Sequence, residues 1–390
     1  MTAATNAADL HDAPDEALEM RRMLRDSAAD FVARSSLARD VRAWRGVEPG
    51  HDRARWRNMA ELGWLGIRVP EEFGGSGLKL ADAVALLSET GRGLGPEPLS
   101  AVAILAARAI VEGGRDEACA ALLPGLCDGS RTIVVASADK AGQMSASEVS
   151  ATAQTRDGRT ILDGTKHYVS GAAAADGFIV AARAEQGVGL YHVPRDARGL
   201  GLDLRPYTDG TFCGTLRLAQ VEVAAGDVVA EPGPGERALD AALEEARVAA
   251  SAEMLGLMRQ AHTMTLDYLR TRKQFGKPIG SFQALQHRAV DLFVEIELAR
   301  SALDRAVRTL DETDDPRARA LAASACKARA SDAALHIARE AIQMHGAIGY
   351  TDEHDIGLFV RRALVLSAWL GNAGTHRRRY AALAPAPDTI

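Results

Sequence analysis

The feature that most constrains this chain is a long helical pattern that follows a Pro/Gly-rich linker at residues 231–235. One buried stripe recurs at three- and four-residue spacing and consists of Leu285, Ala289, Leu292, Ile296, Ala299 and Leu303. Asp314-Asp315-Pro316 separates this helix from the next. Long Ala/Leu-rich helices joined by short breaks predict a four-helix bundle over residues 231–390.

The first 230 residues divide into two blocks of different pattern. Residues 16–130 have helical spacing and predict a helical domain. From Thr132 the chain becomes β-branched and punctuated by glycine, so residues 131–230 predict a central β domain. Its strands are expected at 132–136, 149–154, 160–169, 178–182, 190–193 and 215–223. The predicted fold class is α+β, mainly α, and the small polar residues 1–15 predict a disordered N-terminus.

Composition excludes several classes of protein. A net charge of -6 and a pI near 6.0 leave no global basic field that would attract nucleic acid or anionic lipid. No apolar run approaches the roughly 20 residues of a membrane span, and the acidic, Ala-rich N-terminus has no basic-then-apolar pattern of a signal peptide, so a cytoplasmic location is expected. The four cysteines lack CxxC spacing, which predicts reduced thiols, and no residue set has the spacing of metal ligands.

The most specific local pattern is the string from Tyr268 to Ile279, followed by Phe282-Gln283. A helix is expected to end near Phe275, where Gly276 and Pro278 form a turn before the next helix. The four cations at this corner are Arg270, Arg272, Lys273 and Lys277. Arginine binds phosphate through a bidentate fork, although a solvated basic turn explains the charge alone.

This string resembles the acyl-CoA dehydrogenase signature Y-x-x-x-R-x-Q-F-G-x-P-I-x-x-F-Q. The resemblance implies that Arg272 and Gln283 reach the pyrophosphate and AMP half of an FAD bound to the neighbouring subunit. It also implies that Phe275 packs on the same cofactor and that Phe282 belongs to the same binding site.

A second string, Gln343 to Tyr350, lies 71 residues after Arg272 and resembles the family's Q-x-x-G-G-x-G-Y. The resemblance implies that Gln343 and Gly346 lie close to the FAD of the partner chain, since glycine permits close backbone approach. Ala347 replaces the second glycine of the pattern. Without the resemblance, this string would be interpreted as a helix C-cap.

The β domain carries a third string, residues 162–171, that resembles G-x-K-x-W-I-T/S-N. The resemblance implies that Tyr168 lies against the flavin ring and that Ser170 hydrogen-bonds near its reactive nitrogen. Ser137 begins a loop that departs from the family's T-E-P-x-A-G-S-D but is still expected to touch the flavin. A structural hairpin is the alternative. With residues 62–78, which match a structural segment of the family, the resemblance spans roughly residues 20–380.

The implied activity is FAD-dependent α,β-dehydrogenation of an acyl-CoA or related thioester. The family's habits imply a homotetramer or heterotetramer that passes electrons to an electron-transferring flavoprotein. Hydride leaves Cβ for the flavin while a glutamate removes the α-proton. Family members supply that glutamate at one of two positions, which are occupied here by Leu370 and Ala246. The backbone N–H of Leu370 could still polarise the thioester carbonyl.

Several interpretations of the missing glutamate remain open. Glu253 lies seven residues after Ala246, about two helical turns along the same face, and could act as a displaced base or as a specificity residue. Alternatively, the chain is the base-lacking subunit of a heteromeric acyl-CoA dehydrogenase. A flavin oxidase or monooxygenase of the same fold, or a non-enzymatic structural protein, are the remaining alternatives.

Overall fold

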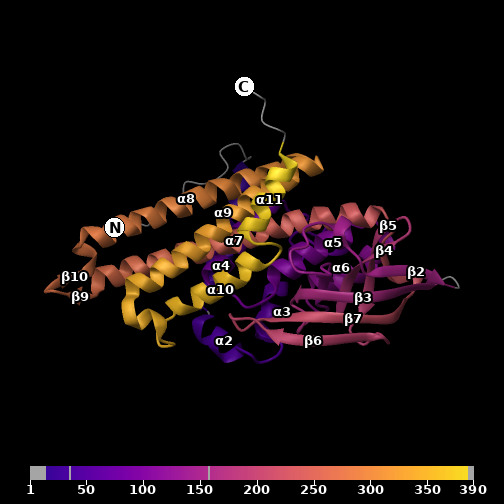
Figure 1. The fold of residues 1–390 in the computed structure, drawn as a ribbon, viewed down its shortest axis with the longest axis horizontal. Helices are drawn as coiled ribbons and strands as arrows, with labels where there is room; N and C mark the ends of the chain where they lie inside the picture. The colour runs from indigo at the N-terminus through magenta and orange to yellow at the C-terminus, as the bar shows by residue number, and fades with distance from the viewer. Residues whose placement is uncertain (1–14, 35–36, 157–158, 385–390) are drawn as a thin grey trace, which may run out of the picture.

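The chain is described here by a computed structural model, in which residues 15–34, 37–156 and 159–384 are placed. Helices come first, strands second and helices again third, which confirms the α+β, mainly α fold class (Figure 1). The predicted disordered segment 1–15 lies outside the described residues, except Asp15, which begins the first helix. The N-terminal elements are α1 (Asp15–Arg34), α2 (Leu37–Trp44), α3 (Arg53–Glu61), η1 (Glu71–Phe73), α4 (Leu80–Arg92), η2 (Ser100–Ala106), α5 (Ala107–Glu112) and α6 (Asp116–Cys127).

The central strands form one sheet in the order β6-β7-β3-β2-β4-β5-β8, with β1 parallel to β4. They are β1 (Ile133–Ala136), β2 (Thr152–Arg156), β3 (Arg159–Ser170), β4 (Gly177–Ala184), β5 (Gly187–Pro194), β6 (Leu200–Pro206), β7 (Phe212–Val223) and β8 (Val228–Ala230), with 3-10 turns η3 (Ala146–Glu148) and η4 (Ala225–Asp227). Only the end of the strand expected at 149–154 is extended in β2. Strands β6 and β8 were not predicted. Leu200, Leu202 and Leu204 alternate along β6, but Gly201 weakens its strand pattern, and β8 has only three residues.

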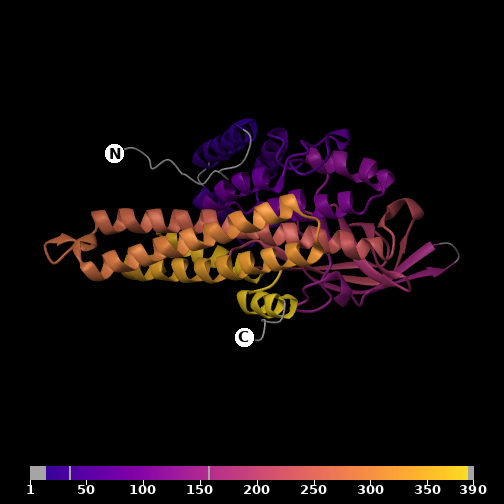
Figure 2. The ribbon, with the colours of Figure 1, turned by 90° about the horizontal axis from the view of Figure 1, so that it is seen from above.

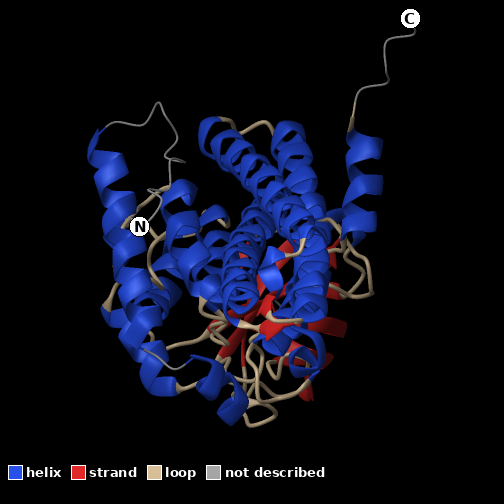
Figure 3. Cartoon of the chain, turned by 90° about the vertical axis from the view of Figure 1, so that its left-hand side faces the viewer, coloured by secondary structure: helices blue, strands red, loops and turns tan. Residues whose placement is uncertain are grey.

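The C-terminal helices form a bundle that extends far beyond the sheet (Figures 1 and 2). They are α7 (Pro234–Thr271), α8 (Gln283–Glu312), α9 (Pro316–His345), α10 (Ile356–Ala368) and α11 (Ala373–Leu383). Seen along the bundle, the N-terminal helices lie against one side of it (Figure 3). The stripe predicted on α8 is buried, except for half-buried Leu285. None of the described helices is both long and apolar enough to cross a membrane.

The distal end of the bundle differs from the predicted helix-turn-helix. Helix α7 ends at Thr271 rather than near Phe275, and a small hairpin follows, made of β9 (Lys273–Gln274) and β10 (Lys277–Pro278). Phe275 and Gly276 form its two-residue turn with φ of 54° and 79°. Paired positive φ values match the twist of a tight hairpin, and Gly276 adopts such a φ without strain. This hairpin lies at the opposite end of the molecule from the sheet (Figure 1).

The N-terminal helical domain is locked onto the bundle where α4 crosses α7. Gly91 faces the backbone of Glu253, and Gly256 faces the backbone of Ser88. A Cβ atom at either glycine would collide with backbone atoms, so both positions require glycine for this close approach. The crossing fixes Glu253 and the segment that follows it on α7 relative to the N-terminal domain.

Candidate active site

A cavity of about 520 Å³ lies where the sheet, η2, α7 and the turn after α10 meet. The β domain contributes Ser137, Tyr168 and Ser170 to its wall, the same residues that the motifs predicted as cofactor contacts. The structure therefore brings these three side chains to one cavity. Tyr168 has φ of 57°, a strained value for a non-glycine residue, and its ring is half exposed. A flat aromatic face beside two hydroxyl groups suits a planar ring that carries polar edges.

The loop that carries Ser137 is fixed by a buried lysine that no motif marked as a site residue. Lys166 pairs with Asp139 at 2.7 Å and donates to the Ser137 carbonyl at 3.3 Å. Burial lowers the pKa of Lys166 to about 8, although Asp139 raises it in part. Asp139 also accepts from the Ser150 N–H at 2.7 Å. The loop is thus tied to the strand that carries Tyr168 and Ser170.

The opposite wall is the turn between α10 and α11, which contains Trp369 and Leu370. Leu370 has φ of 58° and Gly371 has φ of 105°, so the chain reverses sharply here. The N–H of Trp369 donates to the Val365 carbonyl at 2.9 Å, and the N–H of Gly371 donates to the Ala368 carbonyl at 3.2 Å. Leu370, whose N–H was predicted to polarise a thioester carbonyl, comes between these two residues in the sequence. It also lines the cavity.

Lys327 holds this turn from beneath, and no sequence pattern pointed to it. Its ammonium is fully buried and donates to the carbonyls of Leu366, Ser367 and Gly371 at 3.0, 3.1 and 3.1 Å. The last carbonyls of a helix lack partners within it, so a cation here satisfies α10 and opposes its dipole. Burial lowers the pKa of Lys327 to about 7, and the charge of Arg247 lowers it further.

The carbonyl of Leu370 itself accepts from two side chains. His376 Nε2 lies at 3.1 Å and Arg247 Nε at 3.5 Å. Burial lowers the pKa of His376 to about 2, so its ring is neutral and donates through Nε2 to the carbonyl. Arg247 is itself paired with Glu244 at 2.7 Å. Side chains from α7, α9 and α11 therefore fix the backbone of the turn on which a thioester would rest.

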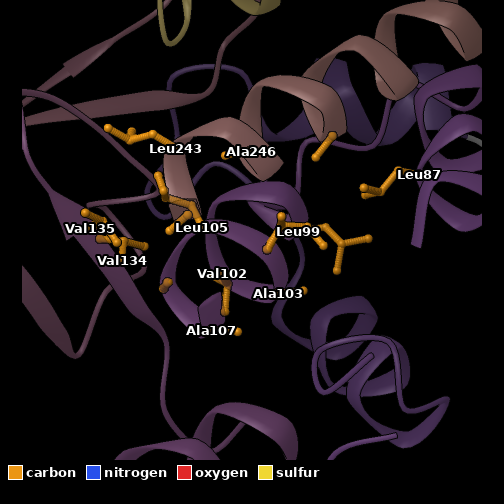
Figure 4. Packing of buried hydrophobic residues seen from close by; sticks show 14 of the residues in the cluster. Leu87, Leu99, Val102, Ala103, Leu105, Ala107, Val134, Val135, Leu243 and Ala246 are labelled. Carbon is orange, nitrogen blue, oxygen red and sulfur yellow. The ribbon is translucent and has the colours of Figure 1, made fainter. Parts of the chain in front are cut away.

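The described lining of the cavity contains a histidine, His167, but no carboxylate. None of the described residues that line it is Asp or Glu, and its ionisable lining includes Lys140 and Arg247. Leu370 occupies one of the two positions where the resemblance places a base. Ala246 occupies the other and lies among apolar side chains of η2, β1 and α7 (Figure 4). The shape of the cavity is present while its carboxylate is absent.

Glu253, the predicted displaced base, lines a smaller cavity of about 30 Å³ that shares Ser170 and Trp369 with the main one. Its carboxylate is engaged at both oxygens. Oε1 accepts from the Ser100 hydroxyl, and Oε2 accepts from Arg362 at 2.8 Å. Arg362 also pairs with Asp209 at 3.0 Å. Buried charges are stabilised by such partners, and a proton acceptor would first have to leave them.

A second buried acid adjoins the same small cavity, and no motif marked it. Glu97 lies 3.2 Å from Arg55 Nε, but neither carboxylate oxygen makes a hydrogen bond with a described residue. Burial raises the pKa of Glu97, opposed by the charge of Arg55. Only the fold reveals this pair, because Glu97 lies in the segment between α4 and η2 while Arg55 lies on α3.

The remaining predicted cofactor residues lie at the distal end of the bundle rather than at the cavity. Arg272, Gln283, Gln343 and Gly346 are exposed, and the Phe275 ring is 91% exposed. Phe275 and Phe282 meet edge to face at 6.1 Å, and Tyr268 stacks on His345 at 4.5 Å, which joins the two strings. Within one chain, these residues therefore lie apart from the cavity.

Comparisons with known proteins agree with this geometry. Residues 19–130 and 233–383 match the N-terminal and C-terminal domains of acyl-CoA dehydrogenase. The acyl-CoA dehydrogenase IpdE2 of Mycobacterium tuberculosis is 32% identical over 346 residues, which cover 88% of this chain and 91% of that protein. This chain belongs to the acyl-CoA dehydrogenase family. The resemblance stated from the motifs is thereby confirmed, and so is the prediction of a flavin-dependent oxidoreductase of this type.

Two solved structures that are similar to this chain carry paired names. The "Tcur3481-Tcur3483 steroid ACAD G363A variant" is 32% identical with a TM-score of 0.84, over 94% of this chain and 98% of that one. The "ChsE4-ChsE5 complex from Mycobacterium tuberculosis" is 26% identical with a TM-score of 0.84, over 96% and 99%. Both therefore cover the fold of this chain almost completely.

Proposed function

We propose that this chain is the base-lacking subunit of a heteromeric, FAD-dependent acyl-CoA dehydrogenase. The observation that carries the proposal is the cavity without a carboxylate, since α-proton removal needs a positioned base. In the assembly, a second type of subunit would supply that carboxylate in its own cavity. The paired names of the two solved relatives support a two-chain assembly.

The residues present fit FAD as two half-sites. Ser137, Tyr168 and Ser170 would hold the flavin ring, and Arg272 with Gln283 would hold the pyrophosphate and AMP half bound to a neighbour. Bound FAD would accept the hydride that leaves Cβ of the acyl group. An exposed aromatic ring such as Phe275 is costly to leave in water, which favours a site completed by another chain.

The surface next to the hairpin also favours assembly. Four large apolar side chains on α8 are exposed at helical spacing, namely Val290, Phe293, Val294 and Leu298. A helix whose second face is apolar buries that face against another helix. A tetramer of two chain types would bury this stripe and bring each hairpin to a neighbour's cavity.

Residues of this chain would still bind the thioester carbonyl, even without a base. The N–H of Leu370 would donate to a thioester carbonyl, and Lys327 with His376 would hold that N–H in place. Electrons would leave through an electron-transferring flavoprotein. A solved structure named for such a flavoprotein of Acidaminococcus fermentans is 25% identical to this chain, with a TM-score of 0.83 over 93% and 97% of the two chains. The proposed substrate class is acyl-CoA thioesters, without a chain length or substituent.

Exchange of the α-proton tests this proposal without any need for net oxidation. The purified chain is reconstituted with FAD and incubated with saturated acyl-CoA thioesters of several lengths in D₂O. Mass spectrometry then measures deuterium at Cα against a protein-free control. We expect exchange no faster than in the control. Rapid exchange catalysed by the chain alone would refute the base-lacking assignment.

A displaced base remains the second candidate because the cavity of Glu253 shares walls with the main cavity. In this mechanism, Glu253 would exchange its bond to Arg362 for the substrate α-proton. If the chain alone catalyses exchange, Glu253→Gln distinguishes the two assignments. Loss of exchange in that variant would establish Glu253 as the base, and an unchanged rate would exclude it.

A further inference from the structure

A second charged cavity lies away from the candidate active site, between α1, α4, α7 and α8. Its volume is about 80 Å³, enough for several water molecules or one small anion. Four arginines and two acids contribute to its wall: Arg21, Arg25, Arg259, Arg300, Glu89 and Asp304. The wall therefore has an excess of guanidinium groups.

Most of these charges are already balanced. Arg21 Nε pairs with Asp82 at 2.9 Å, and Glu89 pairs with Arg92 at 2.7 Å. Arg300 pairs with Asp304 at 3.2 Å and also with Glu297 at 2.8 Å. Each of the two acids of the wall is thus bonded to an arginine other than Arg259, although the charges of both also act on Arg259.

Arg259 is the cation that the described residues leave over. It makes no hydrogen bond or ion pair with any of them, although its side chain is half-buried on α7. Burial lowers the pKa of its guanidinium, and the charges of Arg300 and Arg25 lower it further, while the charges of Glu297 and Glu89 oppose this. A guanidinium withdrawn from water without a partner is unfavourable, so the fold holds a cation here that lacks its anion.

Arg21 gives a second, independent sign of a missing ligand. Its side chain is only 9% exposed, and its Nη1 is buried without a hydrogen-bond partner among the described residues. Buried polar atoms are nearly always hydrogen-bonded in folded proteins. An unsatisfied donor of Arg21 and the unpaired Arg259 therefore line one small polar cavity from two different helices.

The cavity is also held rigidly. Ser88 and Glu89 line it from α4, and Leu255 and Arg259 line it from α7. These residues flank the close crossing at Gly256, where α7 touches the backbone of Ser88. Donors on two helices fixed in this way are pre-organised, which lowers the entropic cost of binding.

We propose that this cavity is a binding site for a phosphate-type oxyanion, held by Arg259 and by the free Nη1 of Arg21. The guanidinium fork matches the geometry of phosphate oxygens, and one anion would satisfy both donors at once. The ligand is either free inorganic phosphate or the phosphate of a small phosphomonoester. The site is independent of the flavin half-sites and of the proposed heteromer.

Thermal unfolding of the full chain tests the site without any measure of catalysis. Inorganic phosphate or AMP is titrated at constant ionic strength set with chloride, and the midpoint temperature is recorded. A ligand that binds only the folded state raises that temperature. We expect a rise of roughly 2 °C or more with inorganic phosphate at saturation. A matching rise with AMP identifies a site open to phosphomonoesters, and its absence identifies a site for the free ion.

Arg259→Gln should remove the response, while the matched control Arg270→Gln should retain it. Arg270 lies on the same helix but is exposed and paired with Asp267 at 3.0 Å. Because Arg259 has no partner to lose, its variant is expected to fold and to be no less stable than wild type in chloride. Calorimetric titration of wild type with phosphate measures the heat of binding as an independent test. An equal phosphate response in wild type and Arg259→Gln, or no heat of binding, would overturn the proposal.

Discussion

The distal hairpin and the central cavity, the two half-sites of one chain, have departed from the family pattern to different degrees. The hairpin region keeps Arg272, Phe275 and Gln283 of the family signature, all in an exposed position away from the cavity. The cavity keeps its walls and its strained turn at Leu370 but lacks a carboxylate. Under the proposed function, binding of a neighbour's cofactor and removal of a proton would thus be carried by separate parts of the fold, so that one could be lost without the other.

The sharpest challenge to this contrast is to restore the carboxylate. Leu370→Glu places a glutamate at a position that lines the cavity, on a turn already fixed by Lys327 and His376. A positioned general base contributes roughly 10²- to 10⁴-fold to rate. We expect acyl-CoA-dependent bleaching of bound flavin to increase by about that factor over wild type, measured anaerobically by stopped-flow absorbance.

Leu364→Glu is the matched control, since Leu364 lines the same cavity from α10. A carboxylate there has no reason to face the α-carbon. Equal activation by both variants would mean that any negative charge suffices, and the positional argument would fail.

Glu253 separates a structural role from a catalytic one. Its bond to Arg362 is buried, and breaking a buried pair costs about 3–5 kcal/mol because one charge is left unpaired. Glu253→Gln should therefore lower the free energy of unfolding by about 3 kcal/mol in urea titrations. Glu295→Gln, which breaks a half-exposed pair with Arg329, should cost less than about 1 kcal/mol. Equal losses would show that the Glu253 pair is not special.

Arg272 tests the other half of the contrast. Hydrogen bonds to charged groups contribute about 1.5–3 kcal/mol, so Arg272→Gln should weaken FAD binding by roughly 10- to 100-fold. Equilibrium dialysis of the assembled protein measures this directly. Arg270→Gln, two residues away and paired with Asp267, should leave FAD affinity unchanged. If both variants bind FAD as wild type does, the hairpin is only a solvated basic turn.

The smallest expected effect is a pH dependence of stability that arises from Lys327, which supports the turn at Leu370. Burial lowers the pKa of Lys327 from 10.5 to about 7, so the unfolded chain binds more protons than the folded one between these values. The contribution of Lys327 to the free energy of unfolding should rise as pH increases from 7 towards 10, by up to about 1 kcal/mol per pH unit. Urea midpoints of wild type and Lys327→Met, compared at pH 7 and pH 9, measure this rise. A difference independent of pH would contradict the assigned ionisation.

Local pattern was sufficient for most of the fold. The buried stripe of α8 has a clear helical periodicity, and β-branched or apolar runs marked the strands β1, β3, β4, β5 and β7. Strands β6 and β8 and the hairpin at Phe275 escaped prediction. A glycine weakens the pattern of β6, β8 has only three residues, and a two-residue turn sets the hairpin.

The candidate site divides in the same way. The cavity positions of Ser137, Tyr168 and Ser170 followed from strings that are contiguous in sequence. Lys327 and Arg362 could not be found in this way. Their partners lie far away in the chain, as with Lys327 and the carbonyl of Gly371 or Arg362 and Glu253. A buried charge is recognised only when the fold brings its partner to it.

The most direct test of the central claim is an anaerobic visible spectrum of the wild-type chain, purified alone and saturated with FAD. A series of acyl-CoA thioesters is added, and absorbance of the oxidised flavin is followed. We predict that the flavin stays oxidised, because no described residue lining the cavity is a carboxylate able to take the α-proton. Prompt bleaching by any of the thioesters would contradict the account.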